Sequence, residues 1–385
     1  MKNLLTNIAT SLLSLLVVFS ILELGTRLFV PKNLYVFSPA TNDWIEDDTL
    51  GWKNKPNHET HTYRFERMVY FSTNPDGLRP IEARREKSPD VIRVMLFGNS
   101  TVASWDIPDQ QTLHRSLDSL LDASGKKFEV INAAVLGYST DQSLLNMKRL
   151  LPIYSPDVVL YGYCINDLYL NASGFYTGLY KPKFQVAGDS LKLELPQQTN
   201  TDFFSNAMAR QTRDLVQYSA LYGFLRPYIQ KVRIKYSRQA ELDQGGINDI
   251  ARYKTPFAQD SLFQLLGLLI KEMDTVSKAH SAQFLYYAHP EVVTVWPPYR
   301  QAIGKEDVDP FIIENKLQEI ADFYSIDFVG MVETFLERQE QGPYHSLPQD
   351  SHCNPKGYLL QAELLAEQIL GKSHQNYNQG QAPSE

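Results

Sequence analysis

The stretch "VMLFGNST", residues 94–101, runs from four apolar residues straight into a short polar turn. A run of consecutive apolar residues is typical of a strand buried inside a parallel sheet. One interpretation of Gly98, Asn99 and Ser100 is a strand-to-helix turn with a polar cap. The other is a serine nucleophile held at the edge of the sheet. The rest of the chain has to decide between them.

Strands and helices alternate after residue 90. We predict strands at 91–98, 128–135, 157–164, 282–288 and 326–330, and helices at 111–124, 140–154, 258–279, 311–324 and 355–371. Thr140 is the expected N-cap of the second helix, and Pro355 is expected in the first turn of the last. Such alternation indicates an α/β fold with a parallel sheet and right-handed crossovers.

The apolar stretch "LLTNIATSLLSLLVVFSIL", residues 4–22, carries no charge. At about 1.5 Å per residue it is long enough to cross a hydrocarbon core of about 30 Å. Lys2 precedes it, which favours an N-terminus inside the cell. No small-x-small cleavage site is evident in the following "ILELGTRLF", so we favour an uncleaved signal anchor over a cleaved signal peptide or a buried core helix. Either of the first two places the remaining chain outside the cytoplasm.

We divide the chain into four parts. They are a signal anchor at 1–23, an extracytoplasmic lead-in segment at 24–88, an α/β domain at 89–371 with an insertion at about 168–256, and a disordered polar tail at 372–385. The insertion includes a stretch at 203–236 that we predict to be helical. It also holds "GFYTGLYKPKF", residues 174–184, whose aromatic residues either pack in the core or cover an open cleft.

Composition excludes some classes of function. The formal net charge is −7 and no basic stripe is present, which argues against a nucleic-acid partner. The two cysteines, Cys164 and Cys353, are too few for a disulfide framework or for a cysteine-based zinc site. We expect no metal and no organic cofactor. Two separate thiols are favoured over a bond between the cysteines. No chemical role is assigned to the histidines other than His352, although His289 follows a predicted strand and could line a pocket there.

Polar residues follow the predicted strands where ligands bind in open parallel sheets, beyond the carboxyl ends. The first strand delivers Ser100, the second is followed by Gly137 in "NAAVLGYST", and the third by Asn166 in "YGYCINDL". The loop "DSHCNPKGY" before the last helix carries Asp350 and His352. We expect these residues to meet at one edge of the sheet.

This set of residue types has a chemical meaning. A serine hydroxyl needs an adjacent base, and histidine, with an unperturbed pKa of about 6.5, suits that role. A carboxylate such as Asp350 would fix the tautomer of His352 and stabilise its charged form. The backbone N–H groups of Ser100 and Gly137 and the side-chain amide of Asn166 would supply donors to an oxyanion.

Serine, glycine, asparagine and histidine in these four blocks resemble the SGNH, or GDSL-type, hydrolases over residues 90 to 371. The resemblance implies a flavodoxin-like three-layer α/β/α sandwich that hydrolyses or transfers acyl esters, often on carbohydrate or lipid. Carried over, Ser100 is the nucleophile, Gly137 and Asn166 complete the oxyanion hole, and His352 is the base oriented by Asp350. "ILELGTRLF" and "NPDGLRP" (74–80) also resemble a membrane-anchored bacterial branch of the family.

The chain departs from the family pattern at three positions. Asn99 replaces the aspartate that usually precedes the serine, and it keeps a hydrogen-bonding side chain without the charge. Asp350 stands two residues before His352 instead of three, and Cys353 follows the histidine where proline or tryptophan is frequent. We do not interpret these changes as inactivation, and Asp167 is expected to be structural.

The leading hypothesis is a membrane-anchored serine esterase that cleaves acyl esters, acetyl esters among them, in the bacterial periplasm through a Ser-His-Asp triad. One alternative is an O-acyltransferase that modifies a cell-surface polysaccharide with the same site. Another is a catalytically silent, membrane-anchored binding module. The sequence leaves open the acyl and alcohol parts of the substrate, carbohydrate or lipid, and the oligomeric state.

Overall fold

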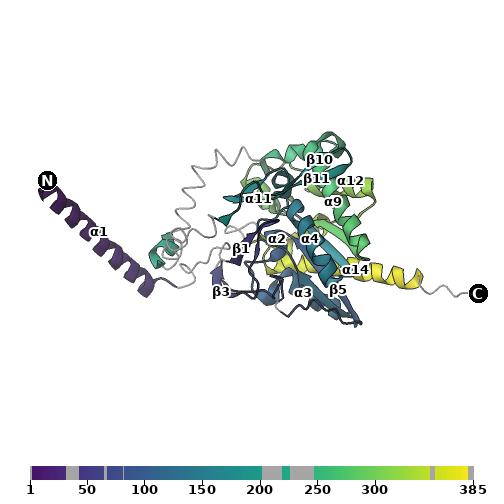
Figure 1. The fold of residues 1–385 in the computed structure, drawn as a ribbon, viewed down its shortest axis with the longest axis horizontal. Helices are drawn as coiled ribbons and strands as arrows, with labels where there is room; N and C mark the ends of the chain where they lie inside the picture. Colours follow the sequence, from purple (N-terminus) through teal and green to yellow (C-terminus); the bar gives the residue numbers. More distant parts are fainter. Residues whose placement is uncertain are drawn as a thin grey trace, which may run out of the picture.

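The structure is a computed structural model that describes residues 2–31, 43–64, 67–80, 82–201, 219–225, 247–346 and 352–379. Helix α1 (Lys2–Phe29) extends away from the sheet and its helices, and the C-terminal end of α14 (Pro355–Gln379) lies on the opposite side of the molecule (Figure 1). Between them a parallel sheet with helices on both faces forms the body of the protein.

The central sheet has five parallel strands in the order β13-β12-β7-β5-β6. The strands are β5 (Val91–Gly98), β6 (Lys127–Asn132), β7 (Val158–Tyr163), β12 (Gln283–Ala288) and β13 (Asp327–Val329). In chain order this is 2-1-3-4-5, the flavodoxin-like order, with its switch point between the first and third strands. The predicted α/β/α fold is therefore confirmed, and β5 and β7 flank the point at which such sheets bind ligands.

Alternate residues of each strand enter two separate cores. In β5, Met95 and Phe97 pack into the core under α4 (Thr140–Tyr154), α9 (Ser261–Ala279) and α12 (Ile312–Tyr324). Val94 and Leu96 face the other core, under α3 (Leu113–Asp122) and α14. Since successive side chains of a strand point to opposite faces, a near-continuous apolar strand is what a sheet covered on both faces requires.

Shorter elements complete the body. They are α2 (Ser100–Ala103), η3 (Asp109–Gln111), α5 (Asp167–Leu170), η5 (Ile247–Lys254), η6 (Phe257–Gln259), α10 (Val292–Val295), α11 (Pro297–Ala302), α13 (Val332–Glu337) and η7 (Gln339–Gln341). Of these, α2 and α5 begin at the carboxyl ends of β5 and β7. They therefore lie at the edge where the candidate residues were expected.

The lead-in segment forms two antiparallel hairpins, β1 (Trp44–Asp47) with β2 (Gly51–Asn54), and β3 (Glu59–Arg64) with β4 (Arg67–Ser72). Trp52 is fully buried, and its Nε1 donates a hydrogen bond of 3.0 Å to the Leu136 carbonyl. Tyr138 Oη donates in return to the Trp52 carbonyl, at 2.6 Å. The first hairpin thus packs against the loop that follows β6.

Some boundaries differ from the sequence prediction. Helix α1 continues to Phe29, beyond the expected end of the anchor at residue 23. The N-cap of α4 is Ser139 and not Thr140, because Thr140 already has helical backbone. Helix α14 runs to Gln379, into the stretch 372–385 that we expected to be disordered; Gly371 does not end it, and the next proline is Pro383.

The insertion begins with two small antiparallel hairpins. They are β8 (Phe175–Tyr176) with β9 (Leu179–Tyr180), and β10 (Lys183–Ala187) with β11 (Ser190–Glu194). Of the predicted helical stretch 203–236, only 219–225 is among the described residues, and 220–225 is helical. The remainder of that prediction lies outside the residues that the structure describes.

A buried ion pair joins the insertion to α4. Lys181 Nζ lies 2.5 Å from Asp141 Oδ2, and both side chains have no exposed surface. The ammonium group also donates to the carbonyls of Leu170 and Ser173, at 2.9 and 3.1 Å. Asp141 accepts further bonds from Ser139 Oγ and from the Gln142 N–H. A buried charge is tolerated when its partner and its hydrogen bonds are all present, as here.

Removing only the positive charge of Lys181 should therefore leave the buried Asp141 carboxylate without its partner. We expect Lys181→Met to lower the free energy of unfolding by about 3–5 kcal/mol. Asp141→Asn added to Lys181→Met should recover part of that loss, because the uncompensated charge is gone. Urea unfolding followed by circular dichroism measures both. The control is Lys183→Met, whose pair with Glu194 is partly exposed, with an expected effect of about 1 kcal/mol or less. Equal losses for the two single variants would contradict the assignment.

Candidate active site

Ser100 stands at an abrupt turn between β5 and α2. Gly98, the last residue of β5, has a φ of +150°, and a Cβ added there would lie 2.5 Å from Val102 Cγ2 and 2.9 Å from the Gly162 carbonyl oxygen. Only glycine fits this position without displacing its neighbours. Asn99 then caps α2, its Oδ1 accepting the Thr101 N–H at 3.0 Å. Ser100 is thereby fixed as the first residue of α2.

His352 lies directly against this serine. Its Nε2 is 2.7 Å from Ser100 Oγ, although the two residues are 252 positions apart in the chain. Both side chains are half-buried. A hydroxyl within hydrogen-bond distance of an imidazole is the arrangement in which histidine can take the hydroxyl proton as a nucleophile forms.

Two backbone N–H groups at this edge carry no partner among the described residues. They belong to Ser100 and Gly137. Gly137 follows β6 with a φ of +79°, a conformation that favours glycine. Unpaired donors at a sheet edge beside a serine hydroxyl are what an oxyanion hole requires.

Asn166 precedes α5 and its side chain is exposed at the end of β7. Asp167, the next residue, is buried and accepts hydrogen bonds from Asn99 Nδ2 at 3.1 Å, Tyr161 Oη at 2.8 Å and the Cys164 N–H at 3.1 Å. Burial raises the pKa of the Asp167 carboxyl to about 7. Asp167 thus joins the turn after β5, through the Asn99 amide, to the turn after β7, through the Cys164 N–H.

Asp350, the expected orienting carboxylate, lies outside the described residues, so its role stays a prediction. A buried carboxylate that the sequence analysis missed is Glu291, two residues after His289 at the end of β12. Its Oε1 accepts the Ile165 N–H at 3.1 Å and the Cys164 thiol at 3.3 Å, and burial raises its pKa. Glu291 therefore supports the loop that carries Asn166. The sequence signal that could have identified Glu291 was its position just after the predicted strand 282–288.

Tyr176 from the insertion covers Gly137. A Cβ added to Gly137 would lie 2.5 Å from Tyr176 Cε1. On its other side Tyr176 stacks on Trp52, with ring centroids 5.7 Å apart and an angle of 22° between the planes. Of the two alternatives for the aromatic stretch 174–184, the structure favours core packing for this ring, which is half-buried and packs against the core next to Gly137. The site combines residues from the body, the insertion and the lead-in segment.

The two cysteines are free thiols and both are buried. Cys164 Sγ donates to Glu291, and Cys353 Sγ accepts a hydrogen bond from Gln361 Nε2 at 3.2 Å. Each sulfur thus has its own polar neighbour. This matches the favoured prediction of two separate thiols.

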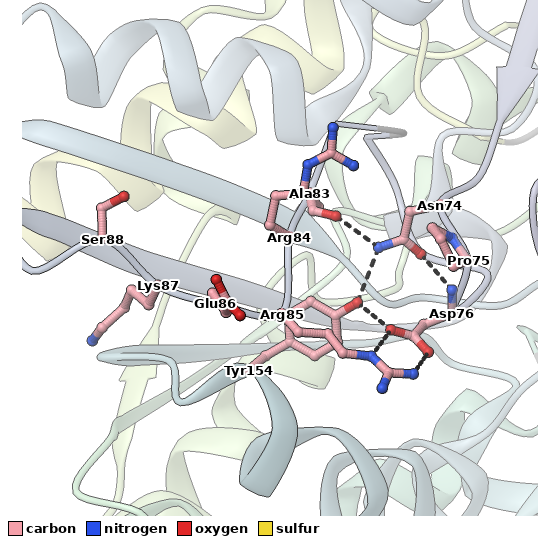
Figure 2. Close-up of a pocket in the computed structure, with 10 residues that line it drawn as sticks. All are labelled: Asn74, Pro75, Asp76, Ala83, Arg84, Arg85, Glu86, Lys87, Ser88 and Tyr154. Atoms are coloured by element: carbon pink, nitrogen blue, oxygen red, sulfur yellow. Dashed lines mark hydrogen bonds and ion pairs between the residues drawn. The ribbon is translucent and has the colours of Figure 1, made fainter.

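A cavity of about 640 Å³ lies elsewhere (Figure 2). It is lined by residues 74–76, residues 83–88 and Tyr154. Figure 2 shows Arg85 forming two hydrogen bonds to the Asp76 carboxylate, which also accepts from Tyr154 Oη. Tyr154 ends α4 and residue 88 precedes β5, so this cavity lies toward the amino ends of the strands. None of the candidate residues lines it.

No protein-family model matches the chain, and no curated protein matches it. Solved structures similar to it include the lipase/acylhydrolase from Enterococcus faecalis, with 13% identity, 73% of this chain and 96% of that chain covered, and a TM-score of 0.39. The acetyl xylan esterase AlAXEase has 13% identity, coverages of 72% and 100%, and a TM-score of 0.39. A GDSL-like lipase from Bacteroides thetaiotaomicron has 13% identity, coverages of 73% and 88%, and a TM-score of 0.33. The strand order of the central sheet gives the chain a flavodoxin-like α/β/α fold.

Proposed function

We propose that the protein is a serine esterase that cleaves acyl esters, with Ser100 as nucleophile and His352 as general base. The observation that carries the proposal is the 2.7 Å contact between Ser100 Oγ and His352 Nε2. It is supported by the position of this pair at the carboxyl edge of the sheet, next to the switch point. A capping serine would need no imidazole at that distance.

The reaction follows from the groups at this edge. Ser100 Oγ attacks the ester carbonyl carbon while His352 Nε2 takes the hydroxyl proton. The Ser100 and Gly137 N–H groups and the Asn166 amide donate to the oxygen that becomes negative. His352 then gives the proton to the leaving alcohol, and an acyl-Ser100 ester remains. Water, deprotonated by His352, releases the acid and restores the serine; Asp350 would hold the imidazole from its other nitrogen.

We further propose that α1 is an uncleaved membrane anchor and that the site faces the periplasm. Residues Ala9–Phe29 are long and apolar enough to cross a membrane, with a mean hydropathy of 1.9. Within this span Glu23 accepts hydrogen bonds from Ser219 Oγ, the Ala220 N–H and the Leu221 N–H, at 2.8, 2.8 and 3.0 Å. Because the insertion contacts α1 in this way, removal of α1 would leave the start of that short helix uncapped.

The nucleophile is tested by Ser100→Ala. We expect hydrolysis of short-chain aryl esters to fall by about 10⁶-fold, as when other serine triads lose their nucleophile. Labelling by a fluorophosphonate probe should also disappear. Ser190→Ala, on the exposed strand β11, should keep both. Near-normal turnover by Ser100→Ala would overturn the proposal, and a folded wild-type protein that neither labels nor hydrolyses esters would favour the binding module.

The same reaction mixture tests the transferase alternative. A polysaccharide acceptor is added to the wild-type protein and the acyl donor, and the products are identified by mass spectrometry. We expect free acid as the main product, because water completes the proposed cycle. Acyl groups found mainly on the polysaccharide would replace the esterase by the transferase.

Gly137 should be sensitive to a single methyl group. Gly137→Ala forces a side chain into a φ of +79° and against Tyr176. We expect kcat/KM to fall by about 10²-fold, the cost of a misplacement of about 1 Å in a catalytic group. Gly125→Ala is the matched control, with a φ of +83° and open space around it. Full activity of Gly137→Ala would contradict the expected displacement of this N–H group by the added methyl group.

Retention of the anchor is tested on the protein isolated from membranes. Intact mass should show residues 1–29 still attached, because "ILELGTRLF" offers no small-x-small site. Leu22→Ala with Leu24→Ala places alanines two positions apart and is the positive control, in which cleavage is expected. A wild-type chain that begins after residue 22 would contradict the anchor.

A further inference from the structure

Three potential metal ligands meet behind the candidate base. His289 follows β12, His345 lies in the segment after η7, and Cys353 directly follows His352. One ligand atom from each residue lies within 4.8 Å of the other two. All three side chains are buried, with exposed fractions of 3%, 2% and 0%. His345 and Cys353 are also paired as an isolated antiparallel bridge, which fixes their segments side by side.

His289 carries the strongest indication of a missing ligand. Both of its ring nitrogens are buried, and neither makes a hydrogen bond of good geometry among the described residues, although the side chain of Gln361 lies close by. A buried polar group left without a partner costs about 1–3 kcal/mol, so it is retained when something else compensates for it. Its ring lies 6.3 Å from that of His345, centroid to centroid, in an edge-on arrangement.

The other two groups make hydrogen bonds of the kind that often accompany metal ligands. His345 Nε2 lies 2.8 Å from the Pro290 carbonyl oxygen. Since a carbonyl can only accept, Nε2 carries the proton and the ring lone pair is on Nδ1. A metal-binding histidine usually donates its other N–H in this way. Gln361 Nε2 lies 3.2 Å from Cys353 Sγ and can donate to a thiolate there.

We propose that His289, His345 and Cys353 form a binding site for one zinc-like transition-metal ion. Two imidazole nitrogens and one thiolate are donors that Zn²⁺ and copper ions prefer, whereas Mg²⁺ and Ca²⁺ require oxygen ligands. On binding, the Cys353 thiol gives its proton to solvent and a metal–sulfur bond forms, while both imidazoles bind as neutral ligands.

The site joins the chain segments that hold His352. Cys353 is its direct neighbour, and the His352 carbonyl accepts the Ser346 N–H at 2.9 Å. A metal held by His289 would therefore tie this loop to the end of β12. Metal ligation here is structural, and its effect on hydrolysis rests on the proposed function of His352. The sequence analysis expected no metal, because two cysteines are too few for a cysteine-based zinc site and serine hydrolysis needs none.

The test uses full-length protein, freed of metal with a chelator under reducing conditions. Titration with Zn²⁺ alone, followed calorimetrically and by competition with a chromophoric chelator, should show one ion per chain. Substitution with Co²⁺ should give a thiolate-to-cobalt charge-transfer band. Cys353→Ser should lose that band and weaken Zn²⁺ binding at least 100-fold. Cys164→Ser, which removes the other buried cysteine, should change neither.

His289→Phe provides a second variant that fills the same space without a ligand atom. It should weaken Zn²⁺ binding and lose the rise in Tm that Zn²⁺ gives the wild-type protein. Absence of Zn²⁺ binding by the wild type, or equal binding by Cys353→Ser and His289→Phe, would overturn the site. Ester hydrolysis is assayed separately, so an inactive protein that binds Zn²⁺ would remove the proposed function and leave the metal site in place.

Discussion

The position of Ser100 depends on a close contact between α2 and two glycines in neighbouring strands. Gly98 of β5 pairs in register with Gly162 of β7. A Cβ at Gly162 would lie 2.5 Å from Val102 Cγ2 and 2.7 Å from Tyr287 Oη. Because neither glycine carries a side chain, Val102 packs directly on the sheet and the chain turns at once from strand to helix. The serine hydroxyl is left at the edge, beside the switch point.

The polar groups beneath that turn hold its neighbours in place. Asp167 joins the turns after β5 and β7 through Asn99 and the Cys164 N–H, and Glu291 supports the Asn166 loop from β12. These carboxylates are buried, so each needs its donors in order to stay there. The same requirement that stabilises the fold therefore fixes the distances between the groups assigned to catalysis.

The sequence predicted what depends on local pattern and on sheet topology. Buried parallel strands appear as apolar runs, and β5 matches its prediction from residue 91 to 98. The position of Ser100 followed from the rule that carboxyl ends share one edge, whereas its meeting with His352 was expected from the residue types and the family resemblance. Contacts between segments that lie far apart in the sequence leave no such pattern. The hydrogen bond of Trp52 to the loop after β6, the stacking of Tyr176 on Trp52 and the hydrogen bond from the Ile165 N–H to Glu291 were therefore not predicted. Asp350 stays a prediction.

The proposed base, His352, stands just before the capped start of α14. Asn354 Oδ1 accepts the N–H groups of Lys356 and Gly357, at 2.9 and 3.1 Å, which is the geometry of a helix N-cap. Its Nδ2 donates to the Pro343 and His345 carbonyls. His352 is thus two residues from a capped helix that packs against α3. With so short a connection, the distance from imidazole to serine depends on how α14 and α3 pack on the sheet.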